Sequence, residues 1–123
     1  MQGIGIDIIE LDRMRETIER SGEVFLKRVF TTLEIQCGRS YASPTRFFAS
    51  AFAAKEAVFK ALVLDWDRGV DLREIEINRG VSGEPMAMLR GVVKMQAEAK
   101  GCSRVLISLS YETDLAVALA VAY

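Results

Sequence analysis

The clearest pattern of apolar and polar positions in this chain is helical, and it covers residues 46–63. Ser43 and Pro44 precede it as a typical helix start, with Ser43 as the N-cap and Pro44 at the first helical position. At about 100° per residue, the apolar side chains fall on two adjacent lines, namely Phe48, Phe52, Phe59 and Val63, and Phe47, Ala51, Val58 and Leu62. The apolar face is therefore wide, and the pattern predicts a long, mostly buried central helix.

Charged residues interrupt this apolar helix at three positions. Lys55 falls inside the apolar sector, whereas Glu56 and Lys60 are four residues apart and stack on one edge of it. Most such Glu–Lys pairs lie in water at the rim of a core and contribute little to stability. An acid and a base held half-buried on a rigid helix are also what a functional site is built from. The periodicity leaves both interpretations open.

The N-terminal residues 1–11 alternate with the period of a β-strand. One side carries Ile4, Ile6 and Ile8, and the other carries Gly3, Gly5, Asp7 and Ile9. We expect both faces to be buried near Asp7 because both are apolar. A buried Asp needs compensation, either from backbone amides or an Arg, or as part of a site. The glycines would permit close approach by a ligand or another backbone.

The remaining elements follow in an order typical of an α+β fold. The first is a helix over residues 13–21, with Asp12 as its N-cap and Gly22 at its end, and a short helix with a capping box follows from Thr31 to about Cys37. Residues 74–78 form a strand with one buried face, which leaves Glu74 and Glu76 in water, and residues 89–100 form an amphipathic helix. Two strands over 104–111 and 115–123, joined by a three-residue loop, complete the chain. The order predicts one domain over residues 1–123, with a mostly antiparallel sheet packed on the central helix.

Composition and charge narrow the class of protein. The chain has 123 residues, of which 50% are hydrophobic, and this suits a single core. A net charge of −1 gives no overall electrostatic attraction for nucleic acid. There is neither an apolar run of about 18 residues, as a membrane span requires, nor a signal-peptide pattern. We expect a cytoplasmic protein without nucleic-acid or membrane partners, with Cys37 and Cys102 as reduced thiols.

The chain contains no His, which restricts its chemistry. Ser-His-Asp and Cys-His nucleophile systems are excluded, as are most zinc and transition-metal sites. Any bound metal should be a hard, oxygen-bound cation such as Mg²⁺ or Ca²⁺. Proton transfer would have to use a carboxylate, Lys, Tyr or water.

Asp7 and Glu56 are the two acids in unusual positions, and they could converge if the helix packs on the sheet. Two carboxylates about 4 Å apart repel by roughly 4 kcal/mol at an effective dielectric constant of about 20, so they stay ionised together only with a cation between them. Two carboxylates plus substrate phosphates are a usual Mg²⁺ arrangement. Lys60, one turn beyond Glu56, would then face a phosphate, and the set suits attack at phosphorus.

Arg13 and Arg20 lie seven residues apart, so they share one face of the first predicted helix. A second basic group follows at Lys27 and Arg28. These charges either form a solvated helix face or a docking surface for an acidic partner helix, because local charge steers encounters even at a net charge near zero.

Several sequence blocks resemble those of one enzyme family and fall in the same order. They are Gly3-Ile4-Gly5-Ile6-Asp7-Ile8-Ile9-Glu10-Leu11 with Arg13, Phe30-Thr31-Thr32-Leu33-Glu34, Arg46-Phe47-Phe48-Ala49, Phe52-Ala53-Ala54-Lys55-Glu56-Ala57 with Lys60-Ala61-Leu62, Ile75-Glu76-Ile77, Gly83-Glu84-Pro85 and Ser108-Leu109-Ser110. Over nearly the whole chain, this resembles the holo-[acyl-carrier-protein] synthases. The Asp strand together with the Lys-Glu helix is the specific part of the resemblance.

These enzymes are 4′-phosphopantetheinyl transferases, and the resemblance implies a small α+β fold that assembles as a homotrimer with sites at subunit interfaces. It implies that Asp7 and Glu56 hold Mg²⁺ on the pyrophosphate of coenzyme A. It also implies that Lys60 stabilises the phosphate being cleaved, and that Arg46, Lys60 and Ser110 bind the coenzyme.

The resemblance also implies the second substrate. A serine hydroxyl of an acyl carrier protein would attack the pantetheine-side phosphorus, and 3′,5′-ADP would leave. The helix with Arg13 and Arg20 matches the carrier-docking helix of the family, and its charge fits an acidic carrier protein. A carrier of fatty acid, other lipid or polyketide synthesis would fit, but the sequence does not name the pathway.

Three positions depart from the pattern of many relatives. Ser50-Ala51 replaces Gly-Arg, Leu64-Asp65-Trp66-Asp67 replaces a Gly-Thr-Gly loop, and Tyr111 replaces a His. The resemblance implies that all three touch the nucleotide half of the coenzyme site, so we expect weaker or altered coenzyme A binding, with Arg46 or Arg68 compensating. Two alternatives stay open: a carrier-binding protein without catalysis, and an enzyme with another donor whose base stacks on Trp66.

Overall fold

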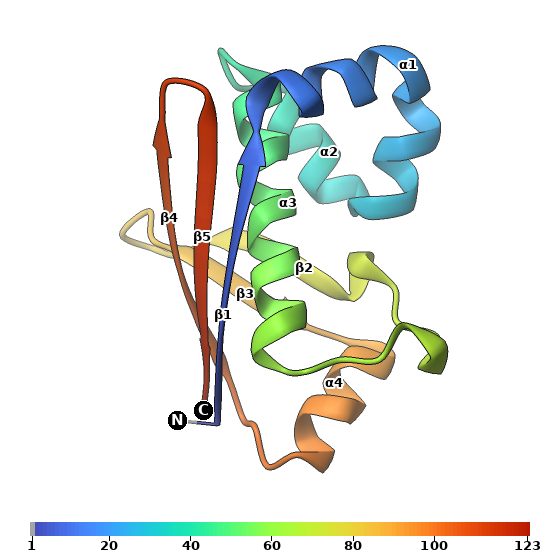
Figure 1. Cartoon of the computed structure of the whole chain (residues 1–123), viewed down its shortest axis with the longest axis vertical. Coiled ribbons are helices and arrows are strands. Elements are labelled where there is room, and N and C mark those ends of the chain that lie inside the picture. Colours follow the sequence, from blue (N-terminus) through green and yellow to red (C-terminus); the bar gives the residue numbers. More distant parts are fainter. Residues whose placement is uncertain (1) are drawn as a thin grey trace.

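A computed structural model describes residues 2–123 of the chain as an α+β structure (Figure 1). Its elements in order are β1 (Gly3–Glu10), α1 (Leu11–Val29), α2 (Thr32–Arg39), α3 (Pro44–Ala61), the short 3-10 turns η1 (Trp66–Arg68) and η2 (Leu72–Glu74), β2 (Ile75–Arg79), β3 (Pro85–Leu89), α4 (Gly91–Ala99), β4 (Val105–Glu112) and β5 (Leu115–Ala122). One antiparallel sheet has the order β1-β5-β4, and β2 and β3 form a separate hairpin. This confirms the predicted fold class.

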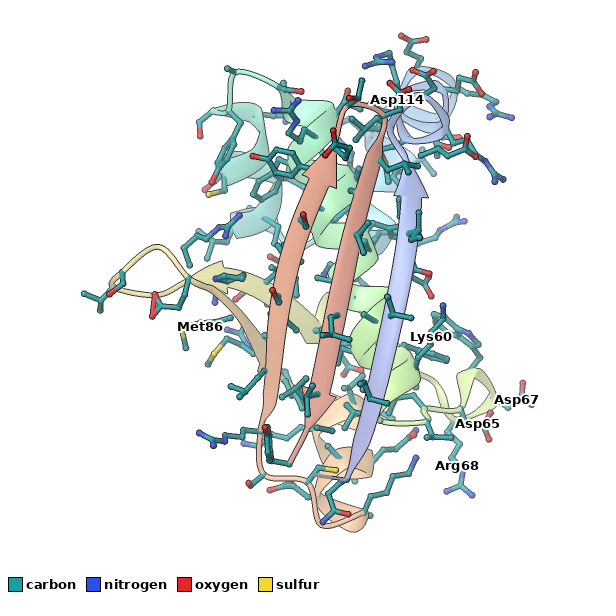
Figure 2. The ribbon with its side chains drawn as sticks, turned by 60° about the vertical axis from the view of Figure 1, so that its left-hand side comes forward. Lys60, Asp65, Asp67, Arg68, Met86 and Asp114 are labelled. Carbon is teal, nitrogen blue, oxygen red and sulfur yellow. The ribbon has the colours of Figure 1, made fainter. Side chains whose placement is uncertain are left out.

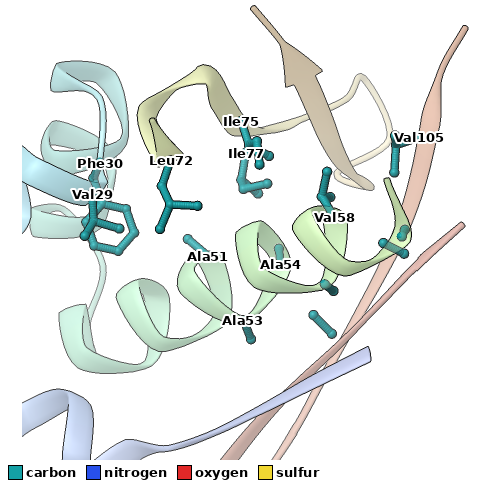
Figure 3. Close-up of a cluster of buried hydrophobic side chains, with 14 of the residues drawn as sticks. Val29, Phe30, Ala51, Ala53, Ala54, Val58, Leu72, Ile75, Ile77 and Val105 are labelled. Carbon is teal, nitrogen blue, oxygen red and sulfur yellow. The ribbon is translucent and has the colours of Figure 1, made fainter. Parts of the chain in front are cut away.

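Helix α3 is the central element, with the β1-β5-β4 sheet on one side and the β2-β3 hairpin on the other (Figure 1). It begins as predicted, because Pro44 is its first residue and the Ser43 side chain accepts a hydrogen bond from the Arg46 amide. On the hairpin side, Leu72, Ile75 and Ile77 pack over α3, as Figure 3 shows. The predicted burial of this helix is confirmed, since most of its apolar residues are almost fully buried.

The sheet approaches α3 very closely because the facing residues are small. The inward side chains of β5 are all alanines and fully buried, namely Ala116, Ala118, Ala120 and Ala122. A Cβ added to Gly3 or Gly5 would overlap with the carbonyl oxygen of Ala61 or Ala57. The glycines of β1 therefore allow the approach of another backbone, which is one of the two predicted roles.

The outer face of the sheet is open, and here one prediction is wrong. Ile4, Ile6 and Ile8 are 59%, 55% and 55% exposed, although both faces of this strand were expected to be buried. Helix α3 covers one face, and no part of residues 2–123 covers the other. In the register of the strands, Ile6 of β1 lies opposite Leu119 of β5. Ile4 lies opposite Val121 of β5, which in turn lies opposite Leu106 of β4. The result is a contiguous apolar surface.

Helices α1 and α2 are both longer than the sequence pattern predicted. The predicted end at Gly22 is only a kink with φ of +49°, and α1 continues to Val29. Helix α2 carries the predicted capping box, in which Thr31 accepts from the Glu34 amide and Glu34 accepts from the Thr31 amide.

None of the described helices combines the length and apolar character that crossing a membrane requires.

The β2-β3 hairpin differs most from the prediction. Residues 85–89 form a strand that the sequence pattern did not predict, and the helix expected from residue 89 begins at Gly91. Glu76 was expected in water but is 4% exposed. The Arg90 guanidinium group donates a hydrogen bond to its carboxylate at 3.0 Å, which compensates the buried charge. At the other hairpin, Glu112 pairs with Leu115, so the loop has two residues instead of three.

A buried ion pair joins α2, α3 and β2. Lys55 is fully buried, with its ammonium group 2.9 Å from Oε1 of Glu34, and it donates hydrogen bonds to the carbonyl oxygens of Leu72 and Ile75. The other Glu34 oxygen accepts from the Ile77 amide at 2.7 Å. Burial lowers the pKa of Lys55, and the charge of Glu34 opposes that shift. The lysine inside the apolar sector is therefore a cross-link between three elements.

Candidate functional site

The middle of β1 and the last turns of α3 bring together Asp7, Glu56 and Lys60. The Lys60 ammonium group donates hydrogen bonds to Oδ1 of Asp7 at 3.0 Å and to the carbonyl oxygen of Ile6 at 2.9 Å. Asp7 lies on the inner face of β1, which packs against α3, and Glu56 is one turn before Lys60. The structure thus places the acid of the first strand beside the acid and base of the central helix.

The environment of Glu56 is unfavourable for a negative charge. Glu56 is half-buried, and this burial raises the pKa of its carboxyl group above the usual value. The negative charge of Asp7 raises the pKa of Glu56 further, whereas Lys60 lowers it. The two carboxyl groups are therefore close enough to repel each other, and a cation placed between them would relieve that repulsion.

These groups fit a hard divalent cation. Oδ1 of Asp7 is held by Lys60, but Oδ2 is buried without a hydrogen-bond partner. A buried carboxylate oxygen without a partner is costly, and a cation satisfies it. Residues 2–123 contain no group of three or more Asp, Glu, Cys or His that could hold a metal ion, so further ligands would come from substrate oxygens or water. Two carboxylates plus phosphate oxygens match the ligand preference of Mg²⁺.

A second region with predicted site residues lies at the other end of α3. Arg46 packs its guanidinium group over the Tyr111 ring, 4.5 Å from the ring centroid. Both line a cavity of about 590 Å³. Ser50 and Ala51 also line it, and the Ser50 hydroxyl is buried without a hydrogen-bond partner. Two of the three departures from the family pattern thus border one cavity.

One chain does not bring all the predicted coenzyme-binding residues together. Arg46 and Lys60 lie on the same helix about 21 Å apart along its axis, at 1.5 Å per residue. Ser110 is exposed on β4, whereas Asp7 is on β1, and β5 separates the two strands. Figure 2 shows Lys60 beyond the β1 edge of the sheet. The set Arg46, Lys60 and Ser110 is therefore split between two edges of the sheet within a single chain.

The basic face of α1 is accessible. Arg13 and Arg20 are both exposed, and Arg13 lies 3.8 Å from Glu10 in an exposed ion pair. Beside this face is a cavity of about 410 Å³ that the sequence pattern did not predict. Phe25 and Phe52 line it, so it lies between α1 and the helix that carries Glu56. Charged and apolar surfaces thus adjoin on this side of the molecule.

Lys100 is a further residue that the pattern missed. Its ammonium group donates to the carbonyl oxygens of Leu62 and Val63, both at 2.5 Å, at the C-terminal end of α3. These carbonyls follow directly after Lys60, so Lys100 fixes the end of the helix that carries the site. Lys100 is 38 positions from Leu62 and 37 positions from Val63 in the sequence. Contacts over such separations leave no periodic signal in the sequence.

Comparison with known proteins identifies the family. The model of the 4′-phosphopantetheinyl transferase superfamily matches residues 3–120. The holo-[acyl-carrier-protein] synthase of Desulforudis audaxviator (strain MP104C) is 42% identical over 120 residues, which are 98% of this chain and 91% of that protein. The crystal structure of holo-[acyl-carrier-protein] synthase from Neisseria meningitidis superposes with a TM-score of 0.92 at 32% identity, covering 100% of this chain and 98% of that one.

A holo-(acyl-carrier-protein) synthase from Bacillus anthracis str. Ames, solved in complex with CoA (3′,5′-ADP), gives a TM-score of 0.77 at 30% identity and covers 98% of this chain and 94% of that one. Sequence and structure agree over nearly the full length. On this evidence the chain belongs to the 4′-phosphopantetheinyl transferase superfamily.

Proposed function

We propose that this protein is a holo-[acyl-carrier-protein] synthase, which transfers 4′-phosphopantetheine from coenzyme A to a serine of an acyl carrier protein. The observation that carries the proposal is the cluster of Asp7, Glu56 and Lys60 in a chain of this superfamily. Relatives with this activity in their names, and structures of such enzymes with coenzyme A, support the choice of substrates.

Asp7 and Glu56 would hold Mg²⁺, which when bound neutralises charge on the pyrophosphate of the donor. The free Asp7 oxygen and the raised pKa of Glu56 support these two residues as ligands. Lys60 places its ammonium group 3.0 Å from Oδ1 of Asp7, and its side chain is 52% exposed, so it can also reach a phosphate of the donor. Its positive charge stabilises the phosphate oxygens as the bond breaks.

The transfer forms one bond to phosphorus and breaks another. The serine oxygen of the carrier attacks the pantetheine-side phosphorus, and the bond from this phosphorus to the bridging oxygen breaks. The leaving group, 3′,5′-ADP, keeps the bridging oxygen. The serine proton passes to water or to a carboxylate at the site, since the chain has no His to accept it.

A homotrimer is part of this proposal, and the apolar outer face of the sheet supports it. Exposed apolar surfaces of this kind mark interaction sites in soluble proteins. The predicted coenzyme residues lie at opposite edges of the same sheet, with Lys60 beyond β1 and Arg46 near β4. Packing of neighbouring copies through the outer faces would join one half of the site to the other half in the next copy.

The carrier protein would dock on α1, where Arg13 and Arg20 offer positive charge and the adjoining cavity with Phe25 and Phe52 offers apolar contact. This placement puts the serine of the carrier near Glu56, because Phe52 is one turn before it on α3. A cytoplasmic location belongs to the same proposal, since coenzyme A and apo carriers must both be available.

The deciding experiment is a mass measurement on several apo carrier proteins incubated with the protein, coenzyme A and Mg²⁺. We expect one carrier serine to gain the mass of phosphopantetheine, and the gain to disappear without Mg²⁺. The variants Asp7→Asn and Glu56→Gln should lose the Mg²⁺-dependent transfer. Absence of transfer to every carrier in the presence of Mg²⁺ would contradict the proposal.

The cavity at Arg46 favours a second candidate, a carrier-binding protein without catalysis. Ala51 there has no charge to offer a coenzyme phosphate, and the Ser50 hydroxyl lacks a partner. Thermal unfolding separates the candidates, because a ligand that binds the native state raises the melting temperature. Stabilisation by coenzyme A with Mg²⁺ supports the enzyme, and stabilisation by the carrier alone supports the binding protein.

A further inference from the structure

We propose that Lys100 is a positioning residue for the transfer, because it holds the strained turn that ends α3 and thereby keeps the ammonium group of Lys60 at Asp7. The inference rests on the proposed function for the role of Lys60 in the reaction. It gives a function in the site to a residue of α4, an element from which none of the proposed site residues comes.

The chain leaves α3 through a backbone conformation that valine rarely adopts. Val63 has φ of +51°. The left-handed position after a helix is usually taken by glycine, which has no Cβ to clash with the backbone. A β-branched residue is strained there, and the strain persists only where the surroundings hold the conformation. The Val63 side chain is 73% exposed, so its own packing contributes little to that hold.

Lys100 supplies contacts that hold this turn. Its ammonium group donates hydrogen bonds to the carbonyl oxygens of Leu62 and Val63, both at 2.5 Å. Carbonyl groups at a helix end lack partners within the helix, and a positive charge is favoured beside them. Lys100 is itself the C-cap of α4, where its amide donates to the Ala97 carbonyl at 3.1 Å. The ends of α3 and α4, which adjoin in Figure 1, are thus tied together.

The same turn is bonded to the residue that carries the reactive charge. The Val63 amide donates to the Lys60 carbonyl at 3.1 Å. From this last turn, the Lys60 side chain reaches the Ile6 carbonyl at 2.9 Å and Oδ1 of Asp7 at 3.0 Å. Because the side chain is 52% exposed, water competes for the ammonium group when the backbone shifts. Loss of the Lys100 contacts would therefore loosen the hold of Lys60 on Asp7.

The first test observes the Lys60 ammonium group by NMR in protein with isotope-labelled lysine. Its signal is assigned by its absence in Lys60→Met, and hydrogen bonds slow the exchange of its protons with water. We expect faster exchange or loss of this signal in Lys100→Met. The amide signals of Ala53 and Ala54, in the buried middle of α3, should stay in place and show that the fold is intact.

This readout requires neither a metal ion nor transfer, so it decides the inference even if the proposed reaction fails. Unchanged exchange at Lys60 in Lys100→Met would overturn the inference. A change spread over all amides of α3 would also overturn it, because Lys100 would then support the fold in general.

The second test compares Lys100→Met and Lys100→Arg in the transfer reaction. We expect kcat to fall roughly 10- to 100-fold in Lys100→Met, because a misplacement of about 1 Å can cost on the order of 100-fold in rate. The KM for the carrier protein should stay constant, since the α1 face is unchanged. Lys100→Arg should restore most of kcat, because a guanidinium group keeps the charge and can donate to both carbonyls. Lys94→Met, on the exposed surface of α4, is the matched control.

The third test asks whether Lys100 acts through the strained turn. Glycine adopts a positive φ without the Cβ clash, so Lys100→Met should lower kcat less when it is combined with Val63→Gly than when it is made alone. Equal losses in both backgrounds, or a fall in kcat with an unchanged Lys60 signal, would show that Lys100 acts by another route and would overturn the inference.

Discussion

The ammonium group of Lys60 lies 3.0 Å from Oδ1 of Asp7, although 53 positions separate the two residues in the chain. Lys60 therefore holds one oxygen of a carboxylate whose other oxygen has no hydrogen-bond partner. The Lys60 ammonium group and a divalent cation would both be attracted to the negative charge of the Asp7 carboxylate, and as two positive charges they would repel each other there. This relationship leads to the first prediction.

Replacing Lys60 by Met should tighten the binding of a divalent cation while it lowers the rate of transfer. The variant removes the positive charge at Asp7 and leaves both carboxylates without compensation. Titration with Mn²⁺, followed by its magnetic resonance signal, measures the affinity without requiring activity. The matched control is Lys94→Met on the exposed surface of α4. Unchanged or weaker Mn²⁺ binding in Lys60→Met would contradict the assignment.

The raised pKa of Glu56 should make stability depend on pH in the absence of metal. Between the ordinary carboxyl pKa of the unfolded chain and the higher pKa in the folded chain, the folded state binds more protons than the unfolded state. The free energy of unfolding therefore decreases as pH rises through that interval. Denaturant titrations at a series of pH values measure this slope, and it should be smaller in Glu56→Gln. An added divalent cation should restore stability at the upper end of the interval.

Reversing the charge of Arg20 should weaken the use of the carrier protein. In Arg20→Glu, we expect the KM for the carrier to rise several-fold, and the KM for coenzyme A to stay constant, because the exposed α1 face is apart from Lys60. The effect should shrink at high salt, since exposed charges are screened. Lys94→Glu has the same charge change on α4 and serves as control. A rise in both KM values would indicate a general defect.

The outer face of the sheet should control the oligomeric state. Ile6 is 55% exposed at its centre and faces Leu119 across the strands. Ile6→Asp would place a charge in an apolar contact, which should shift the protein toward monomer in light scattering. Met95→Asp makes a similar change on α4, where no contact is proposed, and should leave the mass unchanged. Loss of transfer should accompany dissociation if the site spans two copies.

The buried pair of Lys55 and Glu34 should have a large effect on stability. Removing one partner of a buried pair leaves an uncompensated charge and costs about 3–5 kcal/mol, so Lys55→Met and Glu34→Gln should each lower the free energy of unfolding by that order. The double variant should lose less than the sum of both. Denaturant midpoints with unchanged slope provide the measurement. Additive losses would show that the two side chains act independently.

Local sequence determined the elements that need only neighbouring residues. Ser43 and Pro44 specify the start of α3, and the capping box of Thr31 and Glu34 specifies the start of α2, because each partner lies within three residues. The period-2 pattern placed Asp7 on the side of β1 that carries its glycines, and the helical period placed Glu56 and Lys60 on one edge of α3. Composition without His limited the chemistry to carboxylates and lysine.

Tertiary structure decided what depends on residues far apart in the chain. The ion pairs of Lys55 with Glu34 and of Lys60 with Asp7, and the contacts of Lys100 with the end of α3, join segments that have no shared period. The sequence pattern predicts a solvated Glu76, whereas in the structure its carboxylate accepts a hydrogen bond from Arg90. The apolar face of Ile4, Ile6 and Ile8 has the pattern of a core strand, and only the packing of α3 on the opposite face shows that it is open. Side-chain periodicity gives the direction in which a residue points, but the fold decides what it meets there.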